Sequence, residues 1–222
     1  MAERQLTQII NQLQTSASTL SYTDSSALLS KAKLLLLQLN ALTPTAPGSA
    51  SNPSLFSLAR QVYEQGALAS IRAKNPDAFL RYVSQLQGFY ELEGTVGTGA
   101  AGGRIAGPDA NREEKNKVTG LYLLLLLTQG QYAEFHSELE ALSTRLGGVS
   151  ELEADRYLDY PIKLERWLME GSYDRVWKAM KKGEVPCEEY GVFSEVSFAL
   201  AIFSLPSSPL YPPLYRITLN SR

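Results

Sequence analysis

The segment LYLLLLLTQGQYAEFHSELEAL, residues 121–142, decides the fold. A helix through its five consecutive leucines (residues 123–127) is apolar on every side, so it must be buried on every side. After Gly130, apolar residues recur at steps of three and four, which predicts one apolar stripe on a second helix: Tyr132, Phe135, Leu139 and Leu142. Gly130 can adopt the left-handed conformation that ends a helix. The segment therefore predicts an antiparallel helix hairpin whose first helix lies in the core.

Helical patterns continue on both sides of this hairpin. Toward the N-terminus we expect one helix over residues 2–15 and another from a cap at Asp24 or Ser25 to residue 40. We also expect a second helix hairpin over residues 54–92, with the break between its helices at residues 75–77. A Pro/Ser/Gly/Ala-rich linker (residues 43–54) separates the second helix from the third. Toward the C-terminus we expect a helix capped by Ser150 and Glu153, a restart at Tyr160-Pro161, and helices over 172–182 and 188–201.

The hairpin pattern repeats. LLLLTQGQYAEF and ERWLMEGSYDRV both read as helix, glycine, polar residue, tyrosine and amphipathic helix, with Tyr132 and Tyr173 41 residues apart. Phe79 is expected at the matching place of an earlier unit. Such a period without strand signals indicates an all-α protein, a right-handed α-solenoid of helix hairpins of the tetratricopeptide type. We expect structural roles at its hairpins for Gly130, Tyr132, Phe135, Trp167, Gly171, Tyr173 and Trp177.

A glycine-rich segment, residues 94–108, contains a literal GxGxxG at Gly97, Gly99 and Gly102. The dinucleotide fingerprint requires a strand before the glycines and a helix directly after them, and this segment follows a helix. We therefore interpret it as a flexible insertion, and we expect no cofactor.

Composition excludes further classes of site. The chain has 222 residues, with 21 basic and 23 acidic side chains and a net charge of −2, which argues against a protein that mainly binds nucleic acid. One cysteine and one histidine, His136, leave no multi-cysteine metal site, and His136 reads as a structural or surface residue. We predict no catalytic, cofactor-binding or metal-binding residues. The polar start MAERQ and the short leucine runs predict a soluble, intracellular protein without membrane contact.

The hairpin together with YPIKLERWLMEGSYDRVWKAMKKGEVPCEEYGVFSEV resembles the PCI superfamily, and within it the family of non-ATPase subunit 12 of the proteasome regulatory particle lid. The COP9 signalosome and translation initiation factor 3 contain related subunits. The resemblance runs from about residue 55 to 196. It implies a non-catalytic subunit of a hetero-oligomer, bound to other lid subunits and especially to PCI neighbours, in the cytoplasm and nucleus. A scaffold role in one of the sister complexes is the alternative.

Family members end in a winged helix, which the sequence after residue 196 does not continue. Four prolines, at positions 206, 209, 212 and 213, oppose a helix there, and we expect an altered gene model or a natural short form. The expected division is residues 1–42 for N-terminal helices, 54–200 for the PCI-type repeats and 201–222 for an irregular tail. We expect partner contacts on the last helical region, which mixes charges with an exposed aromatic ring: Lys178, Lys181, Lys182, Glu188, Glu189 and Tyr190.

Overall fold

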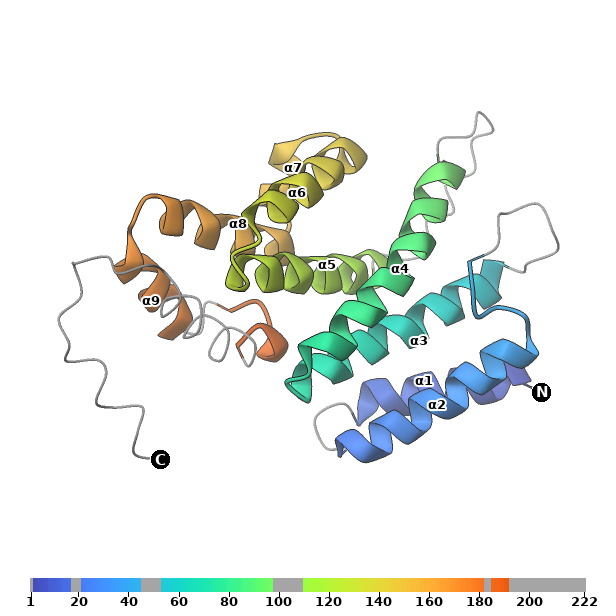
Figure 1. Ribbon diagram of the computed structural model, residues 1–222. Coiled ribbons are helices and arrows are strands. Elements are labelled where there is room, and N and C mark those ends of the chain that lie inside the picture. Colours follow the sequence, from blue (N-terminus) through green and yellow to red (C-terminus); the bar gives the residue numbers. More distant parts are fainter. Residues whose placement is uncertain (1, 17–20, 45–52, 98–109, 182–184, 192–222) are drawn as a thin grey trace.

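The computed structural model shown in Figure 1 describes residues 2–16, 21–44, 53–97, 110–181 and 185–191. Within these ranges the regular elements are helices, which confirms the all-α prediction. Their bounds are α1 (Ala2–Thr15), α2 (Tyr22–Gln38), α3 (Pro53–Arg72), α4 (Pro76–Gly97), α5 (Ala110–Thr128), α6 (Tyr132–Leu146), α7 (Val149–Ala154), α8 (Arg156–Met169) and α9 (Tyr173–Lys181). A further helical turn covers residues 188–191.

The helices stack as successive hairpins. Helices α1 and α2 pack on each other and on α3, and α3 pairs with α4. Helix α5 then contacts α3, α4, α6 and α8, so it lies between the N-terminal helices and the group α6–α9 (Figure 1). Its leucines are at most 2% exposed, as the sequence predicts for a helix that is apolar all round: Leu121, Leu123, Leu124, Leu125, Leu126 and Leu127.

The same turn ends five of the described helices. In each turn one residue is left-handed, and the amide of the next residue donates to the carbonyl five positions earlier, which is the Schellman pattern. The left-handed residues are Asn40 (φ 51°), Lys74 (φ 56°), Gly130 (φ 70°), Gly147 (φ 90°) and Gly171 (φ 70°). The backbone therefore repeats the same turn, although only three of these five turns have a glycine at the left-handed position, where the sequence would reveal it.

The turns also correct the register of the repeat. Lys74 is equivalent to Gly130, so Phe79 corresponds to Phe135 rather than to Tyr132. Both phenylalanines are fully buried, five residues after the left-handed residue. Tyr132 is the first residue of α6, and the proline that begins α4 is its equivalent.

Some helix boundaries differ from the predicted ones. Ser21 precedes α2, so Asp24 and Ser25 lie inside the helix. Ser150, the expected cap, lies inside the short helix α7. The restart expected at Tyr160-Pro161 is placed too late, because α8 begins at Arg156 after its cap Asp155, which accepts hydrogen bonds from the next turn, and Pro161 lies inside the helix. Helix α4 continues through Gly97 into the glycine-rich segment. The rest of that segment and the tail after residue 191 lie outside the described residues, so the expected insertion, final helix and missing winged helix stay predictions.

Candidate assembly interface

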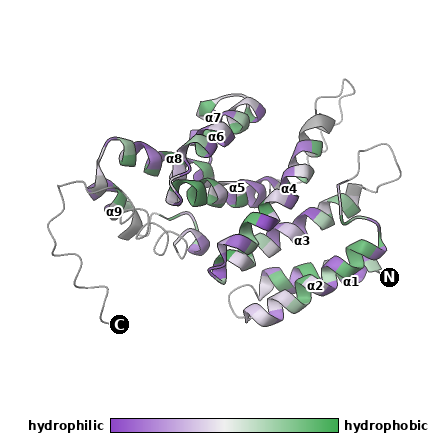
Figure 2. Cartoon of the chain, viewed as in Figure 1, coloured by the Kyte–Doolittle hydropathy of each residue, from purple (hydrophilic) through white to green (hydrophobic). Residues whose placement is uncertain are grey.

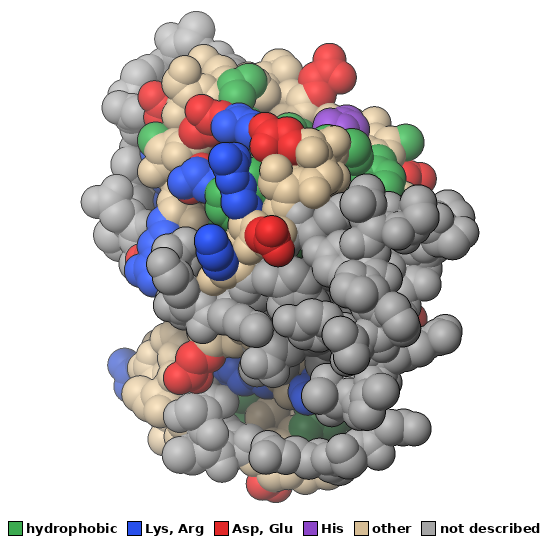
Figure 3. Space-filling model, turned by 90° about the vertical axis from the view of Figure 1, so that its left-hand side faces the viewer, with side chains coloured by type: hydrophobic (Ala, Val, Ile, Leu, Met, Phe, Trp, Pro, Cys, Tyr) green, Lys and Arg blue, Asp and Glu red, His purple; other side chains and the backbone are tan. Residues whose placement is uncertain are grey.

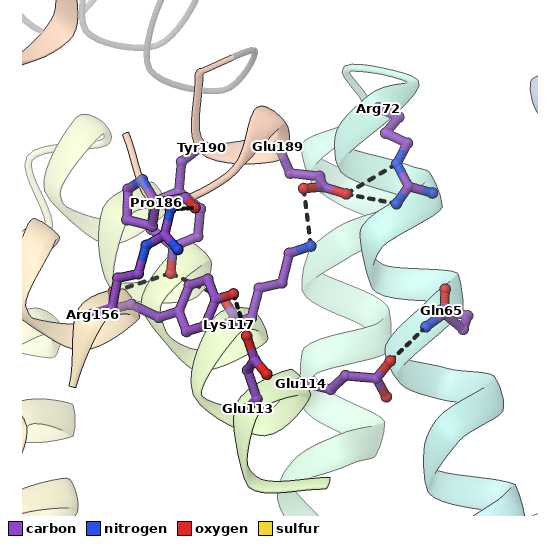
Figure 4. Close-up of polar contacts among 10 residues, drawn as sticks. Gln65, Arg72, Glu113, Glu114, Lys117, Arg156, Pro186, Glu189 and Tyr190 are labelled. Carbon is purple, nitrogen blue, oxygen red and sulfur yellow. Dashed lines mark hydrogen bonds and ion pairs between the residues drawn. The ribbon is translucent and has the colours of Figure 1, made fainter. Parts of the chain in front are cut away.

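The last described segment, residues 185–191, folds back against the helices and is named the docked turn below (Figure 4). Its centre is Tyr190, whose side chain is fully buried. The ring packs against two tyrosines of α8, with centroids 6.2 Å from Tyr157 and 5.8 Å from Tyr160. The hydroxyl lies 3.1 Å from the backbone carbonyl oxygens of Lys117 and Tyr157, which share its one hydrogen. The turn is thus held against α5 and α8 at once.

A proline in α8 explains why Tyr190 fits there. Pro161 lies inside the helix and has no N–H, so the carbonyl of Tyr157, four residues earlier, has no helical donor. The Tyr190 hydroxyl supplies that hydrogen bond. Gly120 of α5 provides the space, because a Cβ at this position would collide with both the Tyr190 hydroxyl and the Tyr157 carbonyl. The Tyr190 hydroxyl therefore fits here because Pro161 leaves the Tyr157 carbonyl without a helical donor and Gly120 leaves space for the hydroxyl.

Glu189 joins the docked turn to the helices by ion pairs. Its Oε1 lies 2.5 Å from Nη2 of Arg72, the last residue of α3, and its Oε2 lies 3.0 Å from Nζ of Lys117 on α5 (Figure 4). Burial opposes ionisation of Glu189, which is 5% exposed, but Lys117 and Arg72 outweigh it and lower the pKa to about 2. The carboxylate is therefore charged at neutral pH and ties α3 to α5 through the turn.

Two further residues complete the docked turn. Arg156, the first residue of α8, donates from Nη2 to the carbonyl of Pro186 at 2.5 Å. Burial raises the pKa of the half-buried Cys187 to about 11, so the thiol is protonated at neutral pH and a poor nucleophile. Arg156 thus links α8 to the turn, and Cys187 fills a structural position within it.

A second polar cluster lies deeper, where α3 meets α4 and α5. The fully buried Glu64 pairs with Arg60 (3.3 Å from Nε) and accepts a hydrogen bond from the Tyr90 hydroxyl at 3.0 Å. Its carboxyl also interacts with that of Glu114, which accepts from Gln65 at 3.1 Å. Burial raises the pKa of Glu64 to about 8, with Arg60 opposing and Glu114 adding to the rise. At neutral pH Glu64 is therefore mostly protonated.

The structure separates the residues expected to contact partners. Lys178 and Glu188 are exposed, in line with that expectation. The expectation of an exposed Tyr190 is wrong, and Glu189 is also buried, because both side chains face the helix stack. The side chain of Lys181 and all of Lys182 lie outside the described part of the chain.

Five of the seven residues expected at the hairpins can be placed, and they lie at turns or pack against the core. Gly130 and Gly171 have the left-handed backbone that the sequence predicts. Phe135 is fully buried, and Tyr132 and Trp167 are half-buried against the core. Tyr173 begins α9, but its side chain and that of Trp177 lie outside the description.

Several charged side chains at the surface of the C-terminal helices pair with opposite charges. On α7–α9, Lys163 pairs with Asp159, Arg166 with Glu153 and Arg175 with Glu170. Figure 3 shows Lys and Arg side chains next to Asp and Glu on this end of the molecule. His136 is exposed on α6, and its Nε2 lies 3.4 Å from Glu165. Among the described residues no cluster of metal-binding side chains occurs, and none of the described helices is long and apolar enough to cross a membrane.

Comparison with known proteins assigns this arrangement to a family. Residues 113–190 match the CSN8/PSMD8/EIF3K family, from the first turns of α5 to Tyr190 of the docked turn. This region therefore belongs to the CSN8/PSMD8/EIF3K family. The resemblance stated from the sequence is confirmed, and the matched region contains Tyr190, all of α8 and most of α5.

Full-length relatives of this family give the same result over more of the chain. The chain is 37% identical to the 26S proteasome regulatory subunit RPN12 of Saccharomyces cerevisiae over 139 residues, 63% of this chain and 45% of the relative. It is 36% identical to the 26S proteasome non-ATPase regulatory subunit 8 homolog A of Arabidopsis thaliana over 71% of this chain and 52% of the relative. It is 32% identical to the 26S proteasome regulatory subunit rpn12 of Schizosaccharomyces pombe over 77% of this chain and 53% of the relative. The chain thus spans about half the length of these relatives.

The sequence did not reveal the docked turn. Tyr190 lies 33 and 73 residues from the carbonyls that it contacts, and the surrounding charges made it look exposed. The available signals were a proline inside the pattern of α8 and a glycine, Gly120, inside that of α5. Each alone is weak, and only the three-dimensional fold brings them together.

Proposed function

We propose that the chain is a non-catalytic structural subunit of the lid of the 26S proteasome regulatory particle, and that it supports ubiquitin-dependent protein degradation through protein–protein contacts. The observation that carries this proposal is its 32–37% identity, over most of its length, to three relatives named as 26S proteasome regulatory subunits. A stack of helix hairpins supports it, because such stacks present extended surfaces to partners. Residence in the cytoplasm and nucleus, as part of a hetero-oligomer, follows from the same proposal.

The docked turn gives the proposal a structural role for named residues. Glu189 and Tyr190 are proposed to position the turn rather than to contact a partner, since both are buried. The exposed Glu188 beside them and Lys178 on α9 are the proposed contact residues. PCI subunits of neighbouring lid positions are the proposed partners.

Affinity purification tests the proposal. The full chain, tagged at the N-terminus, is expressed in cells of its source, and co-purifying proteins are identified by mass spectrometry. We expect recovery of proteasome lid subunits. Recovery of COP9 signalosome or initiation-factor 3 subunits in their place, or of no assembly, would overturn it.

Paired charge reversals test the contact residues. The double variant Lys178→Glu/Glu188→Lys keeps the net charge and is expected to reduce recovery of lid subunits several-fold. The control Arg81→Glu/Glu91→Lys also keeps the net charge and changes two exposed residues of α4. We expect the control to behave like the unmodified chain. Equal recovery from all three proteins would remove Lys178 and Glu188 from the proposed interface.

A further inference from the structure

Helices α1–α4 are joined to the rest of the molecule through α5. Of the described helices, α3 and α4 both pack on α5, whereas direct packing of α1–α4 on α6–α9 is slight at most. The match to the CSN8/PSMD8/EIF3K family begins at residue 113, so this junction connects the family region with the helices that precede it. Figure 2 shows that α5 is hydrophilic toward its start and hydrophobic toward its end. The polar side chains of the junction therefore come from the first turns of α5.

An ion pair and a second carboxyl lie together in this junction. Arg60 and Glu64 of α3 are 2% and 0% exposed, and Arg60 Nε lies 3.3 Å from Glu64 Oε1. The carboxyl of Glu114, half-buried on α5, is a hydrogen-bond partner of the Glu64 carboxyl. A carboxylate can only accept, so a hydrogen bond between two carboxyls requires a proton on one of them. In agreement, Oε2 of Glu64 has no N–H or O–H donor among the described residues.

Side chains of four helices meet at this carboxyl pair. The Tyr90 hydroxyl of α4 donates to Glu64 Oε1 at 3.0 Å. The amides of Gln14 on α1 and Gln65 on α3 both donate to Glu114 Oε1, at 3.3 Å and 3.1 Å, and Figure 4 shows the second of these contacts. A change of charge on the pair therefore acts on α1, α3, α4 and α5 at once.

The charges around the pair balance only when it holds a proton. Arg60 supplies one positive charge, and two ionised carboxyls would supply two negative ones. Lys117 also acts on Glu114 but is paired at 3.0 Å with a carboxylate of the docked turn, and Lys115 lies 4.7 Å from an aromatic ring of α4. A buried net charge is costly, so the favoured arrangement has one proton on the pair. In keeping with this count, burial raises the pKa of both carboxyls, that of Glu64 to about 8.

We infer that Glu64 and Glu114 share one proton, and that this proton attaches helices α1–α4 to α5. While the proton is held, the junction is neutral and closed. When it is lost, two like charges remain in a buried site, and the attachment weakens. The joint does not rest on the proposed function, because all of its groups belong to this chain.

The pH dependence of the joint follows from linkage between proton binding and opening. In an opened junction the carboxyls are hydrated and have their ordinary pKa of 4.5, whereas in the closed junction the pKa of Glu64 is about 8. Between these values opening releases one proton, so the open fraction rises by about tenfold per pH unit and levels off above pH 8. The contribution of the pair to closure is therefore complete below pH 4.5 and is lost as the pH rises through 8.

Infrared spectroscopy of the full chain tests the shared proton. A protonated carboxyl absorbs apart from carboxylates, so we expect its band at pH 6.5, its loss above pH 8 and its absence from Glu64→Gln. We also expect the band to be absent from Glu114→Gln, because Glu64 is then the carboxylate that balances Arg60. Persistence of the band in Glu114→Gln, or no band in the unmodified chain at pH 6.5, would overturn the shared proton.

Hydrogen exchange of the full chain, followed by mass spectrometry, tests the attachment. From pH 5 to pH 8 the protection factors of α1–α4 should fall by about tenfold per pH unit in the unmodified chain and stay constant in Glu64→Gln. Glu91→Gln neutralises an exposed carboxylate on α4 and, as the matched control, should keep the slope of the unmodified chain. A slope that survives Glu64→Gln would overturn the joint. So would equal protection of α1–α4 and α6–α8 at every pH, since the whole chain would then open at once.

Discussion

Glu189→Gln should destabilise the folded chain by about 3 kcal/mol at neutral pH. The carboxylate pairs with Arg72 and Lys117, and these partners lower its pKa from the ordinary 4.5 to about 2. Such a lowering corresponds to about 3 kcal/mol of stabilisation. The neutral amide would leave both cations, which are partly buried, without their counter-charge.

The dependence on pH provides an internal check. Because the folded pKa lies below the unfolded pKa, the stabilisation by Glu189 is present above pH 4.5 and is lost as the pH falls toward 2. The free-energy difference between Glu189→Gln and the unmodified chain should therefore be largest at pH 7 and should shrink between pH 4.5 and pH 3. Urea denaturation followed by circular dichroism measures both values.

Glu153→Gln is the matched control. Glu153 also forms an ion pair, with Arg166 at 2.7 Å, but both side chains are about half exposed. Pairs of this kind contribute less than about 1 kcal/mol. A Glu189→Gln effect no larger than that of the control, or one that does not change with pH, would refute the reasoning that the docked turn is held by a buried ion pair.

Three other substitutions test the packing described above. Gly120→Ala should lower the free energy of unfolding by roughly 1–3 kcal/mol, because the added methyl would meet the Tyr190 hydroxyl and the Tyr157 carbonyl. A thermal melt measures the effect, and an unchanged melting temperature would contradict the docking of Tyr190. Lys74→Gly should stabilise the chain by about 1 kcal/mol, because Lys74 has a left-handed backbone (φ 56°) that glycine adopts without steric cost. Urea titration measures the change, and a destabilised variant would argue against that turn. Glu64 has a pKa raised from 4.5 to about 8, so its contribution to stability is present below pH 4.5 and is lost as the pH rises through 8. Urea titrations from pH 5 to pH 9 should show this loss in the unmodified chain and a smaller one in Glu64→Gln, whereas parallel pH profiles would contradict it.

Much of the fold could be predicted because its signals are local. A helix that is apolar on every side must be buried in the core, and the leucines of α5 are buried there. Two helical patterns separated by a glycine predict a helix hairpin, and α5 packs on α6 in this way. The turn at Lys74 was harder to locate, since the residue that marks it is not glycine and only the backbone shows the left-handed conformation. The cap at Asp155 was missed because the sequence analysis took Tyr160-Pro161 as the start of that helix, whereas Pro161 lies inside α8.

The candidate interface was less predictable, since it depends on contacts between distant segments. Glu189 and Tyr190 stand in a charged, turn-rich sequence that resembles a solvated surface, and their partners Arg72 and Lys117 lie on α3 and α5. A lone carboxylate or tyrosine gives no indication of which helix will face it. The sequence analysis expected these side chains at an exposed surface, whereas Glu189 and Tyr190 are buried, and partner contact by the exposed Lys178 and Glu188 stays a prediction.

Native mass spectrometry of a reconstituted lid tests the central claim most directly. The full chain is mixed with lid subunits purified without their own member of the CSN8/PSMD8/EIF3K family, and the mass of the assembled particle is measured. The account predicts a gain of one copy of the 24.5 kDa chain, reduced by Lys178→Glu/Glu188→Lys. A lid of unchanged mass in the presence of folded chain would contradict the assignment of this protein as a lid subunit.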